Sequence, residues 1–135
     1  MKIEAVIHSA MHDHQVTVQT DGSIKTLTIA PKPDGFGSSV NGGELLLLSI
    51  ATCFCNDIYR EARKRNIVVS SVKLSATGEF GAEGEPGRNF RYEAEVKADA
   101  SDAVIRELVT YVNSIAEIHN TLRKGIDVEL TSAAS

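Results

Sequence analysis

Residues 44–65 read ELLLLSIATCFCNDIYREARKR, a run without glycine or proline that holds both cysteines of the chain, Cys53 and Cys55. We predict a single helix from Glu44 to Arg65, about 33 Å long at a rise of roughly 1.5 Å per residue. This is nearly twice the average length of a helix in globular proteins, so we expect the other elements to pack around it.

The two halves of this predicted helix differ in polarity. Residues 45–50 are apolar almost all round, which predicts burial on every side. The second half is amphipathic, with an inner face of Ile58, Tyr59 and Ala62 and an outer face of Arg60, Glu61, Arg63, Lys64 and Arg65. One small domain has too little surface to cover the first half, so we expect a partner subunit.

The residues around the run suit the ends of a helix. Ser38, Ser39 and Asn41 offer capping oxygens before the first turn, and the charge of Glu44 suits the positive N-terminal end. Asn66 accepts the left-handed conformation that closes a helix. The sequence therefore supports both predicted boundaries.

Three strands are predicted before the helix, over residues 2–9, 15–20 and 23–30, from the alternation of apolar and polar side chains. Asp21-Gly22 is a hairpin turn signal between the second and third strands. A loop rich in glycine and proline, residues 31–43, then leads to the helix.

After the helix, strands are predicted over residues 67–80 and 89–98, followed by a second helix that begins at Ser101 or Asp102. We expect this helix to break near Glu117 and to stop at Gly125. A last strand is predicted over residues 126–131. Because strands and helices come in runs rather than in alternation, the predicted fold class is α+β with mainly antiparallel sheet.

Composition limits the class of protein. The 135 residues predict one domain, residues 1–135. The net charge of −4 and the lack of a basic stripe argue against nucleic-acid binding. No apolar run is long enough to cross a membrane, and the start of the chain lacks the core of a signal peptide, so we expect a cytoplasmic protein that does not engage a membrane.

The two thiols are the first candidates for chemistry. On a helix they point about 200° apart, so we expect free thiols rather than a disulfide. A cysteine on an apolar helix is often inert packing, and nothing nearby in the sequence lowers the thiol pKa. Asp57, one turn after Cys53, disfavours the thiolate. An activating cation would have to come from elsewhere in the fold or from a partner subunit.

The histidines give a weaker signal. His12-Asp13-His14 with His8 or Cys55 offers metal ligands, but without the usual spacing, and we expect a solvated turn instead. His119 fits either a general base or a favourable residue at a helix end. No phosphate-binding glycine loop is present. The sequence therefore predicts neither a metal nor a cofactor.

The run GGELLLLSIATC, continued by FCNDIYREARKRNIVVSSVKLSATGEF, resembles the OsmC/Ohr-like proteins. The segment AEIHNTLRKGIDVEL resembles the C-terminal piece of the same family, and together the likeness covers roughly residues 30 to 130. The resemblance implies an OsmC-like fold and an intertwined homodimer, with long central helices and two sites at the subunit interface. It also implies thiol-dependent reduction of organic hydroperoxides.

The resemblance places the nucleophile of the family at Cys53 and puts Glu44 close to the position of its catalytic glutamate. The sequence departs from the family at two other catalytic positions. Ala116 stands where the resolving cysteine is expected, and no arginine precedes Arg60. The candidate catalytic residues are therefore Cys53, Cys55 and Glu44, with resolution either by Cys55 after local unwinding of the helix or by an external thiol. Because the catalytic set is incomplete, we expect weak or no peroxidase activity. The alternative is a non-catalytic dimer that binds an apolar small molecule in the interface pocket.

Overall fold

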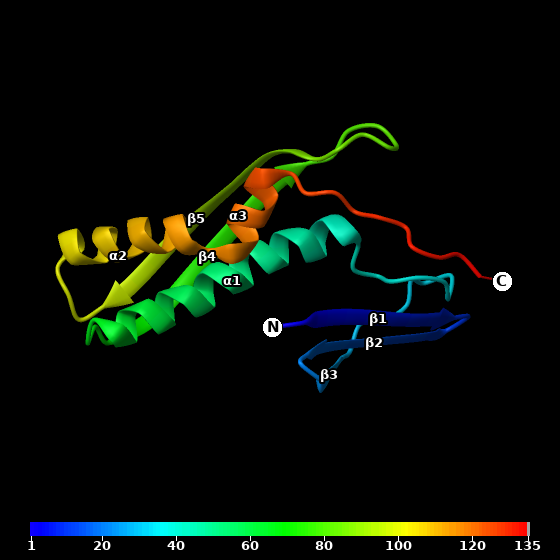
Figure 1. Cartoon of the computed structure of the whole chain (residues 1–135), viewed down its shortest axis with the longest axis horizontal. Coiled ribbons are helices and arrows are strands. Elements are labelled where there is room, and N and C mark those ends of the chain that lie inside the picture. The colour runs from blue at the N-terminus through cyan, green and yellow to red at the C-terminus, as the bar shows by residue number, and fades with distance from the viewer. Residues whose placement is uncertain (135) are drawn as a thin grey trace. The chain divides into compact units, whose positions relative to one another are not determined.

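Three strands, a long helix, a two-stranded hairpin and two shorter helices follow one another in the computed structural model, which describes residues 1–134 (Figure 1). The architecture is α+β with antiparallel sheets, as the sequence predicts. The chain divides into two compact units, residues 1–45 and 46–135, and each is described by itself. None of the helices in the described part of the chain is long and apolar enough to cross a membrane.

The first unit is an antiparallel sheet of β1 (Ile3–Ala10), β2 (Asp13–Thr20) and β3 (Ser23–Leu27), in the order β1-β2-β3. The predicted hairpin turn at Asp21-Gly22 is confirmed, with positive φ angles of 47° and 83° at the two residues. Val16 is the buried hydrophobic residue of this sheet, at 6% exposure. Several other apolar side chains of the sheet lie open to solvent in the single chain, among them Ile3, Ile7 and Ile24.

Helix α1 spans Gly42–Lys64, two residues earlier at its start than predicted. Its first turn is closed by reciprocal hydrogen bonds, in which the Asn41 N–H donates to Glu44 Oε1 at 3.0 Å and the Glu44 N–H donates to Asn41 Oδ1 at 2.8 Å. Asn66 has a φ of 55°, and the Ile67 N–H donates to the Ala62 carbonyl at 2.9 Å. The predicted closing role of Asn66 is confirmed.

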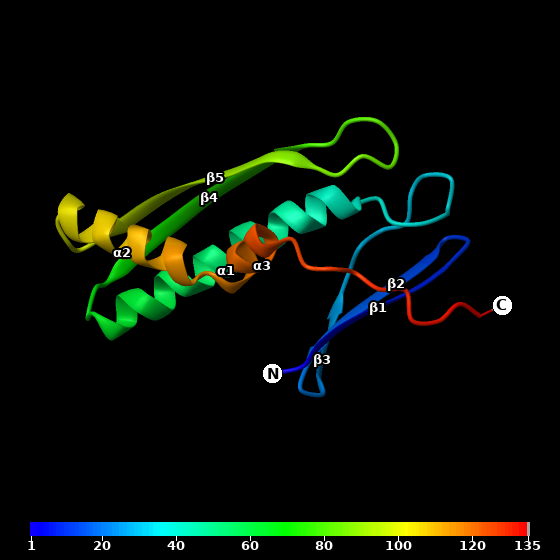
Figure 2. The same cartoon turned by 45° about the horizontal axis from the view of Figure 1, so that its top comes forward.

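The second unit builds its core between helices and hairpin. One stripe of α1 meets one stripe of α2 (Asp102–Ile115), and the buried residues are Phe54, Ile58, Ala62, Leu108, Val112 and Ala116. The inner side chains of the hairpin β4 (Val69–Glu79) and β5 (Arg88–Ala98) cover this cluster from one side. Figure 2 shows α1 and α2 together on one face of the hairpin. The stripes are spaced four residues apart, as expected for helices that pack along one face.

The predicted faces of α1 need correction. Within a single chain residues 45–50 are not buried on every side, because Ile50 is buried whereas Leu48 is 58% exposed. In the second half Tyr59 is 43% exposed and Glu61 is buried. Glu61 lies one turn after Ile58 and therefore on the inner face, where Arg60, Lys64 and Arg65 pair with its carboxylate.

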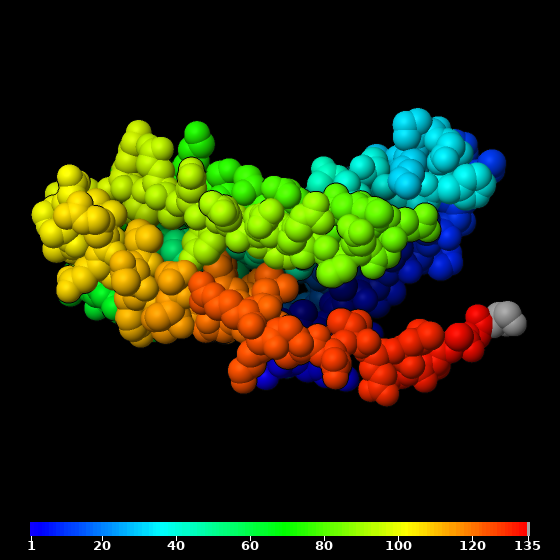
Figure 3. Space-filling view, turned by 90° about the horizontal axis from the view of Figure 1, so that it is seen from above, coloured from blue at the N-terminus to red at the C-terminus, as the bar shows by residue number. Residues whose placement is uncertain are grey.

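The break in the second helix is confirmed. Ala116 has extended backbone angles, φ −63° and ψ 113°, and α3 (Glu117–Lys124) begins directly after it. Gly125, with a φ of 59°, ends α3 as predicted. The space-filling view in Figure 3 shows the side chains of β5, α2 and α3 on one face of this unit.

The predicted strand over residues 126–131 is wrong for this structure. The segment has no strand assignment, and the side chains of Val128 and Leu130 are 98% and 84% exposed. A strand needs a neighbouring edge to satisfy its backbone groups, and no described part of the chain pairs with this segment. The alternating apolar residues that predicted the strand are present, but their pairing partner is not.

Candidate functional site

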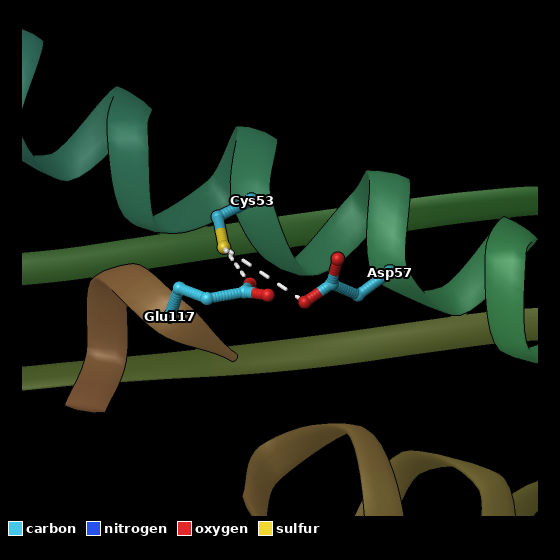
Figure 4. A group of neighbouring side chains, drawn as sticks. All are labelled: Cys53, Asp57 and Glu117. Atoms are coloured by element: carbon cyan, nitrogen blue, oxygen red, sulfur yellow. Dashed lines mark hydrogen bonds between the residues drawn. The ribbon is translucent and has the colours of Figure 1, made fainter. Parts of the chain in front are cut away.

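Cys53 lies in the middle of α1, where the helix passes the junction between α2 and α3. The thiol is partly buried and packs against the core cluster. Because the chain turns at Ala116, the first residue of α3 is directed at this point of α1. Figure 4 shows the result, with Asp57 and Glu117 converging on the Cys53 sulfur from two different helices.

Two carboxylates are the polar side chains nearest the thiol. Cys53 Sγ lies 3.9 Å from Asp57 Oδ2, one turn further along α1, and 4.0 Å from Glu117 Oε2. The thiol donates weakly to both oxygens. Asp57 is 3% exposed, and its other oxygen accepts from Arg60 at 2.7 Å. The nearby guanidinium charge is thus committed to Asp57 rather than to the sulfur.

The surroundings of the thiol disfavour its ionised form. Burial raises the pKa of Cys53 above its ordinary value, and the negative charges of Asp57 and Glu117 raise it further against backbone hydrogen bonds from α3. Burial also raises the pKa of Asp57, which Arg60 partly offsets. The sequence-based expectation that Asp57 opposes the thiolate is confirmed, and Glu117 acts in the same direction.

The two cysteines face different parts of the second unit. Both are free thiols. Cys55 lines a shallow groove with Thr52 and Asn56 of α1 and with Val72 and Leu74 of β4. Cys53 instead faces α3, as the two-residue spacing on a helix requires. The helix therefore keeps the thiols apart.

Glu44, the third predicted catalytic residue, is nine residues before Cys53 on α1. Its carboxylate accepts the backbone N–H of Asn41 at 3.0 Å and so completes the helix cap. The structure thus gives Glu44 a structural partner and does not bring it together with Cys53.

The ligand atoms of Cys53, Asp57 and Glu117 all lie within 4.8 Å of one another. A thiolate and two carboxylates are ligand types that zinc accepts. They are the one group of three such residues in the described part of the chain. The histidines of residues 8–14 form no such group there. The hydrogen bonds of Cys53 to both carboxylates and the ion pair of Asp57 with Arg60 also explain why these three side chains lie together, without a metal ion.

Sequence reasoning missed Glu117 as a neighbour of the thiol. The sequence indicates Glu117 only as the place where the second helix breaks. The contact depends on three-dimensional geometry, because the break in the helix turns Glu117 toward α1. No spacing rule between residues so far apart in sequence gives that contact.

The chain is similar to proteins that share this fold. A family model described as OsmC-like protein matches residues 35–131. No curated protein sequence matches the chain. Among solved structures, an OsmC-like protein from Mycoplasma pneumoniae is 25% identical, with a TM-score of 0.61. That alignment covers 90% of this chain and 86% of the other.

Two further structures are more distant in sequence. The organic hydroperoxide resistance protein OsmC from Legionella pneumophila is 20% identical over 96% of this chain and 94% of its own, with a TM-score of 0.57. An organic hydroperoxide resistance protein from Elizabethkingia anophelis is 17% identical over 91% of this chain and 89% of its own, with a TM-score of 0.54. At these identities the likeness shows the fold.

Proposed function

Because the chain belongs to the OsmC-like family, we propose that it is a homodimeric, cytoplasmic thiol protein that reduces organic hydroperoxides slowly through Cys53. The observation that carries the proposal is the position of Cys53, a partly buried thiol in the middle of α1 with two carboxylates as its polar neighbours. We take organic hydroperoxides as the substrate class because two structural neighbours are organic hydroperoxide resistance proteins.

In the proposed reaction the Cys53 thiolate attacks the terminal oxygen of the hydroperoxide. The O–O bond breaks, the sulfur is oxidised to a sulfenic acid, and the peroxide is reduced to an alcohol that takes up the thiol proton. An external thiol then condenses with the sulfenic acid and releases water. A second external thiol cleaves the mixed disulfide and restores Cys53.

Three features of the site make this reaction slow. Burial and the two carboxylates raise the pKa of Cys53, so the reactive thiolate is scarce near neutral pH. Ala116 stands where the resemblance expects a resolving cysteine. Cys55 faces β4, so resolution by this thiol would require α1 to unwind locally. The sulfenic acid of Cys53 therefore persists and is open to further oxidation.

The homodimer is supported by apolar surface that the single chain leaves uncovered. Leu48 of α1 is 58% exposed, and the apolar side chains of β1 and of residues 126–130 are also open. Exposed apolar surface of this extent favours an interface over a monomer. A second copy of the chain would also supply the edge that residues 126–131 lack for pairing as a strand.

The rival function is a non-catalytic dimer that binds an apolar small molecule at its interface. The raised thiol pKa favours it, because a packing cysteine needs no thiolate. The deciding experiment is mild treatment with cumene hydroperoxide followed by intact-mass analysis, on the wild type and on Cys53→Ser. Cys55→Ser is the matched control.

Our proposal expects the wild type and Cys55→Ser to gain oxygen on one cysteine, and Cys53→Ser to gain none there. With excess peroxide and no reductant, a sulfinic acid should accumulate in place of an intramolecular disulfide. A wild type that stays at its starting mass would reject the peroxidase and leave the binding protein. Rapid turnover with a dithiol, without sulfinic product, would instead show that a cation activates Cys53.

A further inference from the structure

Next to the core of the second unit lies a cleft of about 130 Å³ that does not include Cys53. Its walls come from α1, β5 and α3, and the apolar part of the lining is Ile50, Phe90 and Leu122. An apolar cavity of about 150 Å³ is known to hold one benzene ring. The cleft therefore suits a small molecule with a single ring or a short chain.

His119 is a lining residue whose polar atoms are unaccounted for. The imidazole is 5% exposed and packs against two aromatic rings, with centroid distances of 4.6 Å to Tyr92 and 5.5 Å to Phe54. Neither ring nitrogen has a hydrogen-bond partner among the described residues. A neutral imidazole has one donor and one acceptor, and leaving both unpaired in the interior is unfavourable. A bound ligand that hydrogen-bonds to the imidazole is the simplest explanation for these two unpaired nitrogens.

The charged residues that line the cleft indicate the charge of a ligand that would bind there. Arg91 and Arg123 line it, and no Asp or Glu of the described chain does. Arg123 donates only to neutral oxygens, the Asn113 carbonyl at 2.9 Å and the amide oxygens of Asn113 and Asn120 at 2.8 and 2.9 Å. Neither arginine forms an ion pair within residues 1–134. Two positive charges on an apolar cleft thus lack a counter-charge.

We propose that this cleft is a binding site for a small organic carboxylate, whose carboxylate pairs with Arg91 and Arg123 and whose apolar body packs against Ile50, Phe90 and Leu122. A guanidinium binds a carboxylate through parallel, charge-assisted hydrogen bonds. A carboxylate oxygen also supplies an acceptor for the N–H of His119. The site is distinct from the thiol site and does not depend on the reactivity of Cys53.

The test is a titration of the full chain with sodium benzoate, followed by NMR of the histidine and tyrosine rings. Benzamide is the neutral probe of the same shape. Arg91→Gln is the principal variant, because Arg91 is exposed and its loss should not disturb the core. Arg88→Gln is the matched control, since Arg88 lies on the same strand but pairs with Glu79 and Glu85 outside the cleft. All proteins carry Cys53→Ser, which separates the result from any peroxide chemistry.

We expect saturable shifts of the His119 ring with benzoate in the millimolar range, and binding of benzamide about tenfold weaker. Arg91→Gln should weaken benzoate binding about fivefold or more and leave benzamide unchanged, while Arg88→Gln should bind as the parent does. His119→Gln, which keeps a donor and an acceptor, should retain most of the affinity. Equal binding of the two probes, equal binding by Arg91→Gln, or the absence of saturable shifts at His119 would each overturn the proposal.

Discussion

The Cys53 thiol lies 4.0 Å from the Glu117 carboxylate, although 64 residues separate them along the chain. A reactive cysteine usually has a cation or a helix N-terminus beside it, which favours the thiolate. The first turn of α3 does direct backbone N–H groups at the Cys53 sulfur, and these lower the thiol pKa, but the Glu117 side chain is negative and Asp57 adds a second negative charge at 3.9 Å. Burial and the two carboxylates outweigh these backbone groups, so the pKa of Cys53 is raised and the neutral thiol is favoured.

Removing one of these charges should make the thiol more reactive. We expect Glu117→Gln to raise the rate of alkylation of Cys53 by iodoacetamide at pH 7 about threefold, because loss of a neighbouring negative charge favours the thiolate. The measurement uses a Cys55→Ser background so that only Cys53 reports. Glu93→Gln, on the exposed side of β5, is the control. A slower rate in Glu117→Gln would mean that the carboxylate assists deprotonation instead.

Glu44 should matter for stability rather than for chemistry. We expect Glu44→Ala to lower the free energy of unfolding by about 0.5–1 kcal/mol, because the Asn41 N–H loses its partner at the helix cap. Glu44→Gln preserves an acceptor and should cost less. Alkylation of Cys53 should be unchanged in both variants. Loss of thiol reactivity with intact stability would restore Glu44 as a catalytic residue.

Acid should weaken the fold through Glu61. Hydrogen bonds from Lys64, Arg60 and Arg65 lower the pKa of this carboxyl to about 2 in the folded chain, below its ordinary value of 4.5. A depressed pKa contributes stability above the unfolded value, and that contribution is lost as the pH falls from about 4.5 toward about 2. Glu61→Gln removes the contribution.

The measurement is urea unfolding at a series of pH values. The free energy of unfolding of the wild type should fall as the pH is lowered through this window, and the fall should be shallower in Glu61→Gln. Glu95→Gln is the control, because Glu95 is exposed and its lysine partner lies 3.9 Å away. Parallel curves for the wild type and Glu61→Gln would contradict the assignment.

The proposed dimer can be tested at Leu48. We expect Leu48→Asp to reduce the apparent mass in light scattering, or to unfold the chain if no stable monomer exists, because a charge cannot be buried at an apolar interface without a partner. Val104→Asp places the same charge on the exposed side of α2 and should keep the wild-type mass. A wild type that is already a stable monomer at micromolar concentration would defeat the dimer.

Most of the fold is accessible from local patterns in the sequence. The long helix follows from a run without breakers, and its ends follow from Asn41, Glu44 and Asn66, because capping depends on neighbours within a few residues. The Asp21-Gly22 turn and the stop at Gly125 are local for the same reason. The strand predicted over residues 126–131 fails because pairing is not local, and the alternation of side chains cannot supply an edge.

The site divides in the same way. The sequence predicts Asp57 as a neighbour of Cys53, because the two residues are one helical turn apart. Local patterns do not link Glu117 to the thiol, and they leave His119 as either a general base or a helix-end residue, because the contacts of both depend on how α3 packs against α1 and β5. The buried position of Glu61 was missed for a related reason. Its charge suggests solvent, but three basic side chains satisfy its carboxylate at the edge of the core.

The bend at Ala116 also offers a route for redesign. Ala116 is fully buried, belongs to the cluster against which Cys53 packs, and occupies the position where the resemblance expects a resolving thiol. Ala116→Cys would add a single sulfur atom to a filled interior, at a cost of roughly 1–3 kcal/mol if the surroundings do not yield. In return, the cluster against which Cys53 packs would contain a second thiol, which could condense with a sulfenic acid formed on Cys53. Under the proposed function, one added sulfur atom at this bend is the difference between a protein that depends on an external thiol and one that carries its own resolving cysteine.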